Sequence, residues 1–199
     1  MILSNSIVIR RITAYVIDIF IVGVIVGLIL SSSGMRVNNY DDDKIDKLIN
    51  DYASEKISTE EYINKYSDIL YDINQESFND NIIYLIVSIG YFLIFQFLNG
   101  GASIGKRVMN IRIVNKNKKS VSFWQLLIRV GLVNQIFSML LLVIITKMLV
   151  GSSFLIGYGF VSMIRSIIII VCVITLVFAK NNVSLHDKLS KSQVIIDGK

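Results

Sequence analysis

Charged residues inside the long apolar segments of this chain are the ones whose types and spacing could do chemistry. Asp18 lies within the run RRITAYVIDIFIVGVIVGLIL, residues 10–30, which is otherwise almost entirely apolar. Placing an ionised carboxylate in a bilayer costs about 2.5–3.5 kcal/mol on insertion scales, so Asp18 is expected to have a partner or a function. Two chemistries are open for it: an ion pair that holds helices together, or a protonatable group on a proton or cation pathway.

Arg129 is the partner that the sequence predicts for Asp18. Asp18 lies seven residues after Arg11, which is about 10 Å along a helix. Arg129 lies five residues after Trp124, an interfacial residue type, and is therefore about 8 Å deep. Because both depths are counted from the same side, they predict a direct, bidentate Asp18–Arg129 pair. Arg11, Ala14 and Asp18 share one helix face, which we expect to point into a bundle.

The segment GGASIGKR, residues 100–107, has the spacing of a phosphate-binding loop without its context. An apolar helix, not a strand, precedes it, and Arg107 stands where a Ser or Thr would hold magnesium. We expect a tight turn at the membrane surface, with Lys106 and Arg107 facing anionic headgroups. No nucleophile–base pair is visible and His186 is the only histidine, so we expect no enzyme, no metal site and no cofactor.

The composition is that of a membrane protein with several spans. Of the 199 residues, 53% are hydrophobic, above the roughly 45–50% of soluble domains. Proline is absent and Ile, Asn and Lys are abundant, which is typical of a low-GC bacterium. The lone Cys172 is expected only to pack. Four apolar stretches approach the length needed to cross a bilayer; they are residues 12–31, 82–98, 126–146 and 160–179.

The distribution of charge predicts the orientation in the cell membrane. Residues 32–80 contain twelve acidic and five basic residues, whereas residues 99–121 contain six basic residues and no acidic one. Basic loops are retained in the cytoplasm, so we expect both termini and the 99–121 loop inside, and residues 32–80 outside. The charge asymmetry therefore indicates orientation in a lipid bilayer, and we expect no nucleic acid partner.

Two small elements are expected outside the membrane. Residues 42–55 and 59–75 carry apolar residues at helical spacing, with an S-x-x-E capping box beginning at Ser58, and predict an acidic helical hairpin. The segments at 110–114 and 193–196 alternate β-branched residues and predict a two-stranded cytoplasmic ribbon.

The expected fold class is therefore an all-α membrane protein. We expect a four-transmembrane-helix bundle with an extracytoplasmic acidic helical hairpin and a small two-stranded ribbon. The whole chain, residues 1–199, is expected to be a single domain, with residues 32–80 as an insertion.

Four ordered sequence blocks resemble the RDD family of membrane proteins. The pattern R-x-x-A-x-x-I-D from Arg11 to Asp18 resembles the opening signature of the family, and GASIGKRVMNIRIV resembles its glycine–lysine block. FWQLLIRV, which contains Arg129, resembles the entry to its third helix, and SLHDKLSKSQVI resembles its closing block. The family is named for one Arg and two Asp. Its matches here are Arg11, with Arg10 as the other candidate, and Asp18 and Asp187.

The resemblance implies two classes of function. Some family members are proposed transporters, including sodium/proton antiporters. By that resemblance this chain is a transporter or transport-associated subunit for a small cation or a proton, with Asp18 as the protonatable or cation-binding group. Arg129 is then its counter-charge and Asp187 lies near the inner mouth. Four spans make a small pore, so a transporter of this type is expected to form a homo-oligomer.

The alternative is a non-transporting scaffold or accessory protein, which eukaryotic relatives of the family resemble. Such a protein would dock other membrane or secreted components through its outer hairpin and through the G-x-x-x-G face at Gly23 and Gly27.

Single-cysteine labelling tests the orientation. In a Cys172→Ser background, we expect a cysteine at Asp43 to react with a membrane-impermeant maleimide in intact cells. Cysteines at Lys116 and Lys191 should react only after permeabilisation, because basic loops stay in the cytoplasm. Labelling of position 116 in intact cells would overturn the orientation.

Overall fold

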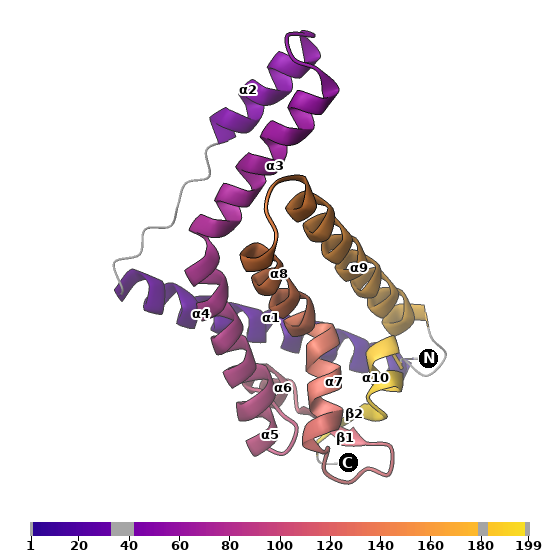
Figure 1. Cartoon of the computed structure of the whole chain (residues 1–199). Coiled ribbons are helices and arrows are strands. Elements are labelled where there is room, and N and C mark those ends of the chain that lie inside the picture. Colours follow the sequence, from indigo (N-terminus) through magenta and orange to yellow (C-terminus); the bar gives the residue numbers. More distant parts are fainter. Residues whose placement is uncertain (1, 33–41, 179–182, 198–199) are drawn as a thin grey trace.

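The computed structural model describes residues 2–32, 42–178 and 183–197, and this part of the chain is mostly helical (Figure 1). The long elements are α1 (Ile2–Ser32), α2 (Asp42–Ala53), α3 (Thr59–Glu76), α4 (Phe78–Ser88), α7 (Phe123–Val133), α8 (Ile136–Met148) and α9 (Gly151–Phe178). The short ones are the π-helix η1 (Ile89–Phe95), α5 (Gln96–Leu98), α6 (Ile104–Val108), β1 (Ile111–Asn115), α10 (Leu185–Leu189) and β2 (Ser192–Ile196).

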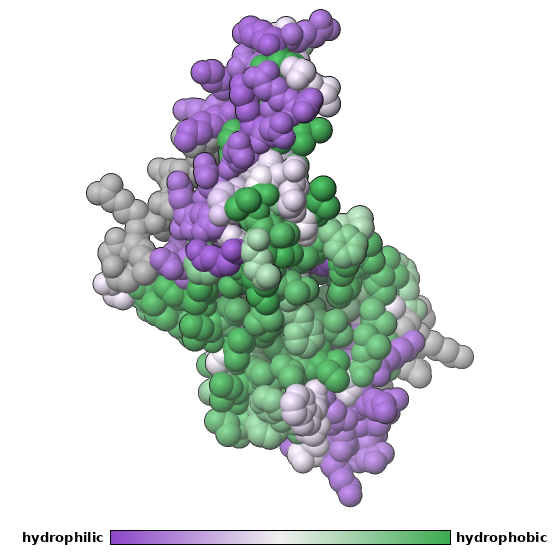
Figure 2. Space-filling model, in the orientation of Figure 1, coloured by the Kyte–Doolittle hydropathy of each residue, from purple (hydrophilic) through white to green (hydrophobic). Residues whose placement is uncertain are grey.

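Three helical segments are long and apolar enough to cross a bilayer, or four if the bent pair α7–α8 is one span. The three are residues Ile7–Ser32 of α1, the continuous stretch Phe78–Leu98, and the whole of α9. Figure 2 shows the matching surface, an apolar band between a hydrophilic hairpin at one end and a hydrophilic patch at the other. An exposed apolar band of this kind is the surface that lipid covers in a membrane protein.

Two of the predicted spans differ in form from the expected single helices. The third is broken between α7 and α8, which meet at a bend of 67°. The break lies at Asn134 and Gln135, where Gln135 adopts a left-handed conformation with φ of 59°. The fourth begins at Gly151 instead of 160. Hydropathy averaged along the chain shows neither feature, because apolar residues flank both the polar pair Asn134–Gln135 and the start of α9 at Gly151.

The predicted hairpin is present as α2 and α3, which project from the other helices in Figure 1 and beyond the apolar band in Figure 2. Ser58 caps α3 by accepting a hydrogen bond from the Glu61 amide at 3.2 Å. Leu48 is buried, and the rings of Tyr52 and Tyr62 lie 4.7 Å apart between the two helices. Its extracytoplasmic placement stays a prediction.

The predicted ribbon is confirmed as an antiparallel pair of β1 and β2, with Ile111 opposite Ile196 and Ile113 opposite Val194. Ile111 and Ile113 are buried, because the alternating apolar residues of β1 face the bundle. Gly101 holds β1 in place: its carbonyl accepts from the Ile113 amide at 3.0 Å. The ribbon thereby ties the two basic segments together beneath the helices.

Alanine at Gly101 should destabilise the protein more than alanine at Gly100. Both glycines have positive φ, which costs a residue with a Cβ about 1–2 kcal/mol. A Cβ at Gly101 would also lie 2.2 Å from the Ile113 carbonyl oxygen, whereas at Gly100 it meets nothing within 4 Å. Thermal unfolding of the detergent-purified variants measures this, and equal losses would contradict the packing explanation.

Candidate functional site

The charged residues of the predicted site gather around two buried carboxylates. We call the first group the Asp18 centre; it comprises Asp18, Tyr91, Ser103, Gly105 and Lys106. We call the second the Asp187 centre; it comprises Arg11, Arg129, Ser184, His186, Asp187 and Ser192. Asp18 is 0% exposed and Asp187 is 1% exposed, so neither carboxylate can rely on bulk water for its solvation.

In the Asp18 centre, neutral donors and one cation surround the carboxylate. Its Oδ1 accepts hydrogen bonds from the Tyr91 hydroxyl at 2.6 Å and the Gly105 amide at 2.8 Å. Its Oδ2 accepts from the Ser103 hydroxyl at 2.5 Å, and the Lys106 ammonium lies 3.5 Å away. These contacts replace the hydration that burial removes.

Local sequence brings α6 against α1. Ser103 caps α6 in an extended conformation, and the Asp18 carboxylate satisfies an amide in its first turn. Gly105 is required for this approach, because a Cβ there would lie 2.3 Å from the Ala14 carbonyl oxygen. The family-like GASIGK block is therefore a helix start that fits against α1.

The expectation that Lys106 and Arg107 both face headgroups was wrong for Lys106. Its side chain is 18% exposed and turns inward to Asp18 and to the Ser103 hydroxyl, 3.1 Å away. Arg107 lies outside and donates to the Asn99 side chain at 2.5 Å. Burial is the largest of the causes that lower the pKa of Lys106 to about 8. The charge of Asp18 raises this pKa, whereas the charges of Arg129 and Arg11 lower it further.

In the Asp187 centre, one carboxylate is shared by two guanidinium groups. Arg11 donates to Oδ2 at 2.7 Å, and Arg129 donates to Oδ1 and also to the Ser192 hydroxyl at 2.8 Å. The Ser184 amide donates to Oδ2 at 3.0 Å, so Asp187 also caps the helix that contains it. Burial alone would raise the pKa of Asp187, but Arg129 and Arg11 more than offset burial and hold it well below its usual range.

His186 is an uncharged member of the Asp187 centre. Its Nε2 lies 3.1 Å from the Arg11 guanidinium, which has only donors, so this nitrogen accepts. Burial, and then the charge of Arg129, lower the pKa of His186 to about 2. Among the residues that the structure describes, no group of three or more His, Cys, Asp or Glu side chains could hold a metal ion.

The predicted direct pair between Asp18 and Arg129 was wrong. Arg129 pairs with Asp187, and Asp18 pairs with Lys106. The depth argument placed Asp18 and Arg129 correctly inside the bundle, but equal depth does not decide which way a side chain points. The closing segment folds back to Arg129 and brings a carboxylate that the argument had left near the surface.

Arg10 and Arg11, the two candidates for the arginine of the family signature, make different contacts. Arg11 reaches Asp187, whereas Arg10 donates to the Met109 carbonyl at 2.7 Å. Sequence reasoning missed Tyr91 and Ser184, for which the only signal was a polar group in or next to an apolar segment. Tyr91 lies in η1, whose wider turn is a feature often found at functional sites.

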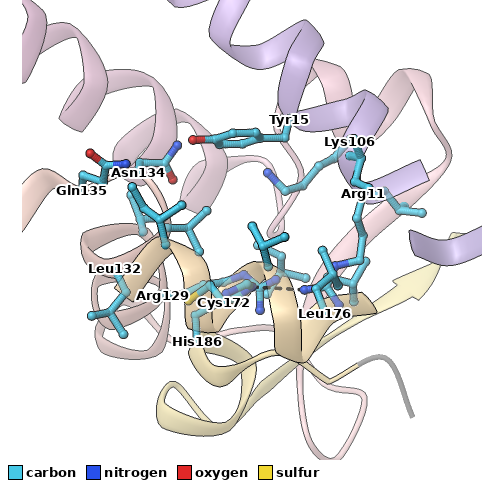
Figure 3. A pocket seen from close by; sticks show the side chains of 18 of the residues that line it. Arg11, Tyr15, Lys106, Arg129, Leu132, Asn134, Gln135, Cys172, Leu176 and His186 are labelled. Atoms are coloured by element: carbon cyan, nitrogen blue, oxygen red, sulfur yellow. Dashed lines mark hydrogen bonds between the residues drawn. The ribbon is translucent and has the colours of Figure 1, made fainter. Parts of the chain in front are cut away.

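A cavity of about 390 Å³ lies between the two centres. Figure 3 shows Tyr15, Lys106, Arg129 and Cys172 around it. Asn134 and Gln135, where the third span breaks, also line it. The carboxylates of Asp18 and Asp187 do not line it, so the cations stand between these carboxylates and the cavity.

Comparison with known proteins identifies the family of the chain. The RDD family model matches residues 7–191, nearly the whole chain. No curated protein and no solved structure matches the chain. The matched region contains both centres.

A double-mutant cycle should show that Arg129 is coupled to Asp187 and not to Asp18. Asp187→Asn and Arg129→Gln should each lower stability by about 3–5 kcal/mol, because each leaves a buried charge unpaired. The double variant should lose clearly less than the sum of the two.

The control cycle combines Arg129→Gln with Asp18→Asn, whose losses should be close to additive. Thermal and denaturant unfolding in detergent measure both cycles. Stronger coupling to Asp18 than to Asp187 would contradict the observed pairing.

Proposed function

Because the chain belongs to the RDD family of membrane proteins, we propose that it is a transporter or transport subunit that exchanges a small cation for a proton at the Asp18 centre. The observation that carries this proposal is the Asp18–Lys106 pair. A buried carboxylate has a lysine as its cation, and that lysine also lines a cavity. Buried charged pairs inside membrane proteins are often parts of ion or proton pathways.

Lys106 is the proton carrier in this proposal, instead of the Asp18 that the sequence suggested. Above a pH of about 8 the ammonium loses its proton to the cavity, and Asp18 then has no counter-cation. A small hard cation such as sodium can take its place, with carboxylate and hydroxyl oxygens of Asp18 and Ser103 as ligands. Protonation of Lys106 restores the ion pair and releases the cation.

The other parts of the Asp18 centre hold the carboxylate still during this exchange. Tyr91, Ser103 and the Gly105 amide bond to it through neutral donors. The Asp187 centre supplies the positive charge of Arg129, which lowers the proton affinity of Lys106. Its role is therefore positioning and electrostatic tuning.

The break in the third span supports a pathway beside these residues. Non-helical backbone at membrane depth is tolerated where it is buried in protein or lines a cavity, and broken helices form the binding sites of several transporter folds. Asn134 and Gln135 lie at such a break, and both line the cavity.

A scaffold is the second candidate, and two observations favour it. The α2–α3 hairpin projects away from the apolar band and exposes Ile49 and Ile63. A Cβ at Gly23 or Gly27 would meet no described atom within 4 Å, so this face of α1 is open to a partner helix. A scaffold would fold as described but would exchange no ions.

Flux in proteoliposomes distinguishes the two candidates. An outward proton gradient should drive sodium uptake by the wild-type protein. The rate should rise as pH increases through about 8, because neutral Lys106 leaves Asp18 free for the cation. Asp18→Asn and Lys106→Met should lose the exchange at least about tenfold. Arg107→Met is the matched control and should retain it, since Arg107 lies outside the centre. Absence of exchange in the wild-type protein would contradict the transporter proposal and leave the scaffold as the remaining candidate function.

A further inference from the structure

The walls of the cavity are built largely from apolar side chains. They come from α1, α7, α9 and the ribbon, and include Ile12, Val130, Val133, Ile169, Val173 and Val177. The volume of about 390 Å³ is within the range of about 300–1,000 Å³ that ligand sites in proteins occupy. A wall of this composition suits a hydrocarbon chain better than a hydrated ion.

Part of the cavity lining also belongs to the exposed apolar surface of the bundle. Ile12 on α1 is 48% exposed, and Val173 and Val177 on α9 are 54% and 47% exposed, although all three line the cavity. The two helices have different packing partners, since α1 contacts mainly α6 and α4 whereas α9 contacts mainly α3 and α8. The cavity therefore lies between two parts of the bundle, and its rim belongs to the apolar band.

The polar end of the cavity is cationic. Arg11, Lys106 and Arg129 line it, and among the described residues the carboxylates that pair with them are those of Asp18 and Asp187. Outside residues 32–80 the chain has one further acidic residue, Asp197, which pairs with Arg112 at 3.2 Å. Because His186 is neutral, three cations stand against two carboxylates in the part of the chain that the structure describes. Surplus positive charge beside an apolar space favours an anion there.

The two ends are spaced for an amphiphile. Val177 lies next to the end of α9 and Ile169 lies eight residues earlier, which is about 12 Å along the helix. The cationic residues Arg11 and Arg129 belong to the same end of the bundle as α10 and Val177. Basic pockets between transmembrane helices bind the headgroups of anionic lipids, and guanidinium groups match phosphate oxygens in pairs.

We propose that this cavity binds one anionic phospholipid of the surrounding membrane. Its phosphate lies against Arg11, Lys106 and Arg129, and one acyl chain enters between α1 and α9 along Ile169 and Val173. The site shares Lys106 with the proposed exchange but does not include Asp18, which does not line the cavity, and it would exist equally in a scaffold.

Native mass spectrometry of the full chain in nonionic detergent tests the proposal. Dioleoylphosphatidylglycerol should be retained at one copy, at least about tenfold more than dioleoylphosphatidylcholine at equal concentration. Equal retention of the two phospholipids would overturn the proposal, because an adventitious annular lipid behaves in this way. Oleate that displaces phosphatidylglycerol would also overturn it, since the occupant would then be a free fatty acid.

Matched tryptophan variants locate the site. Val173→Trp fills the cavity, whereas Ile174→Trp is the neighbouring control, similarly exposed and outside the lining. We expect the first to lose phosphatidylglycerol at least about fivefold relative to the second. Ile12→Trp, with Val16→Trp as its control, repeats the comparison on the opposite wall. If the Val173 and Ile174 variants fold poorly, this second pair tests the proposal in their place. Equal retention within the pairs would place the lipid elsewhere and overturn the proposal.

Discussion

The carboxylate of Asp187 joins parts of the chain that are far apart in sequence. It accepts from Arg11 on α1 and from Arg129 on α7, and it lies on the short helix α10 that follows the last span. Each of these charges would be costly to bury alone, and removing any one of them leaves the others unsatisfied. This constraint brings the first, third and fourth spans together at one end of the bundle, and the ribbon closes beneath them.

The Asp18 centre repeats the same solution with different partners. In both centres a buried carboxylate satisfies the first turn of a short helix, α6 for Asp18 and α10 for Asp187, and each carboxylate also holds a cation. The difference lies in the cation. Guanidinium groups keep their charge at any physiological pH, whereas a buried lysine can lose it. One centre is therefore permanently charged and the other can change its charge, and the proposed exchange at Asp18 rests on this contrast.

The cavity follows from how these centres are satisfied. Their carboxylates turn away from it toward helix starts, and their cations remain at its wall. The apolar residues of α7 and α9 complete that wall, and the break at Asn134 and Gln135 provides amide groups at membrane depth. A cationic end and an apolar body in one space are a consequence of the same packing that buries Asp18 and Asp187.

The sequence by itself determined the class, the family signature and the small elements. Hydropathy predicted the spans, capping and spacing predicted α2 and α3, and β-branched alternation predicted β1 and β2, because each of these signals is local. The sequence also singled out Asp18, Arg129, Arg11 and Asp187, each of which lies in one of the two centres. Tertiary structure alone decided how they pair. Depth along a helix gives one coordinate of a side chain, whereas an ion pair requires that two side chains agree in all three coordinates. The helices α6 and α10 fold back against the bundle and supply Lys106 and Asp187 as nearer partners.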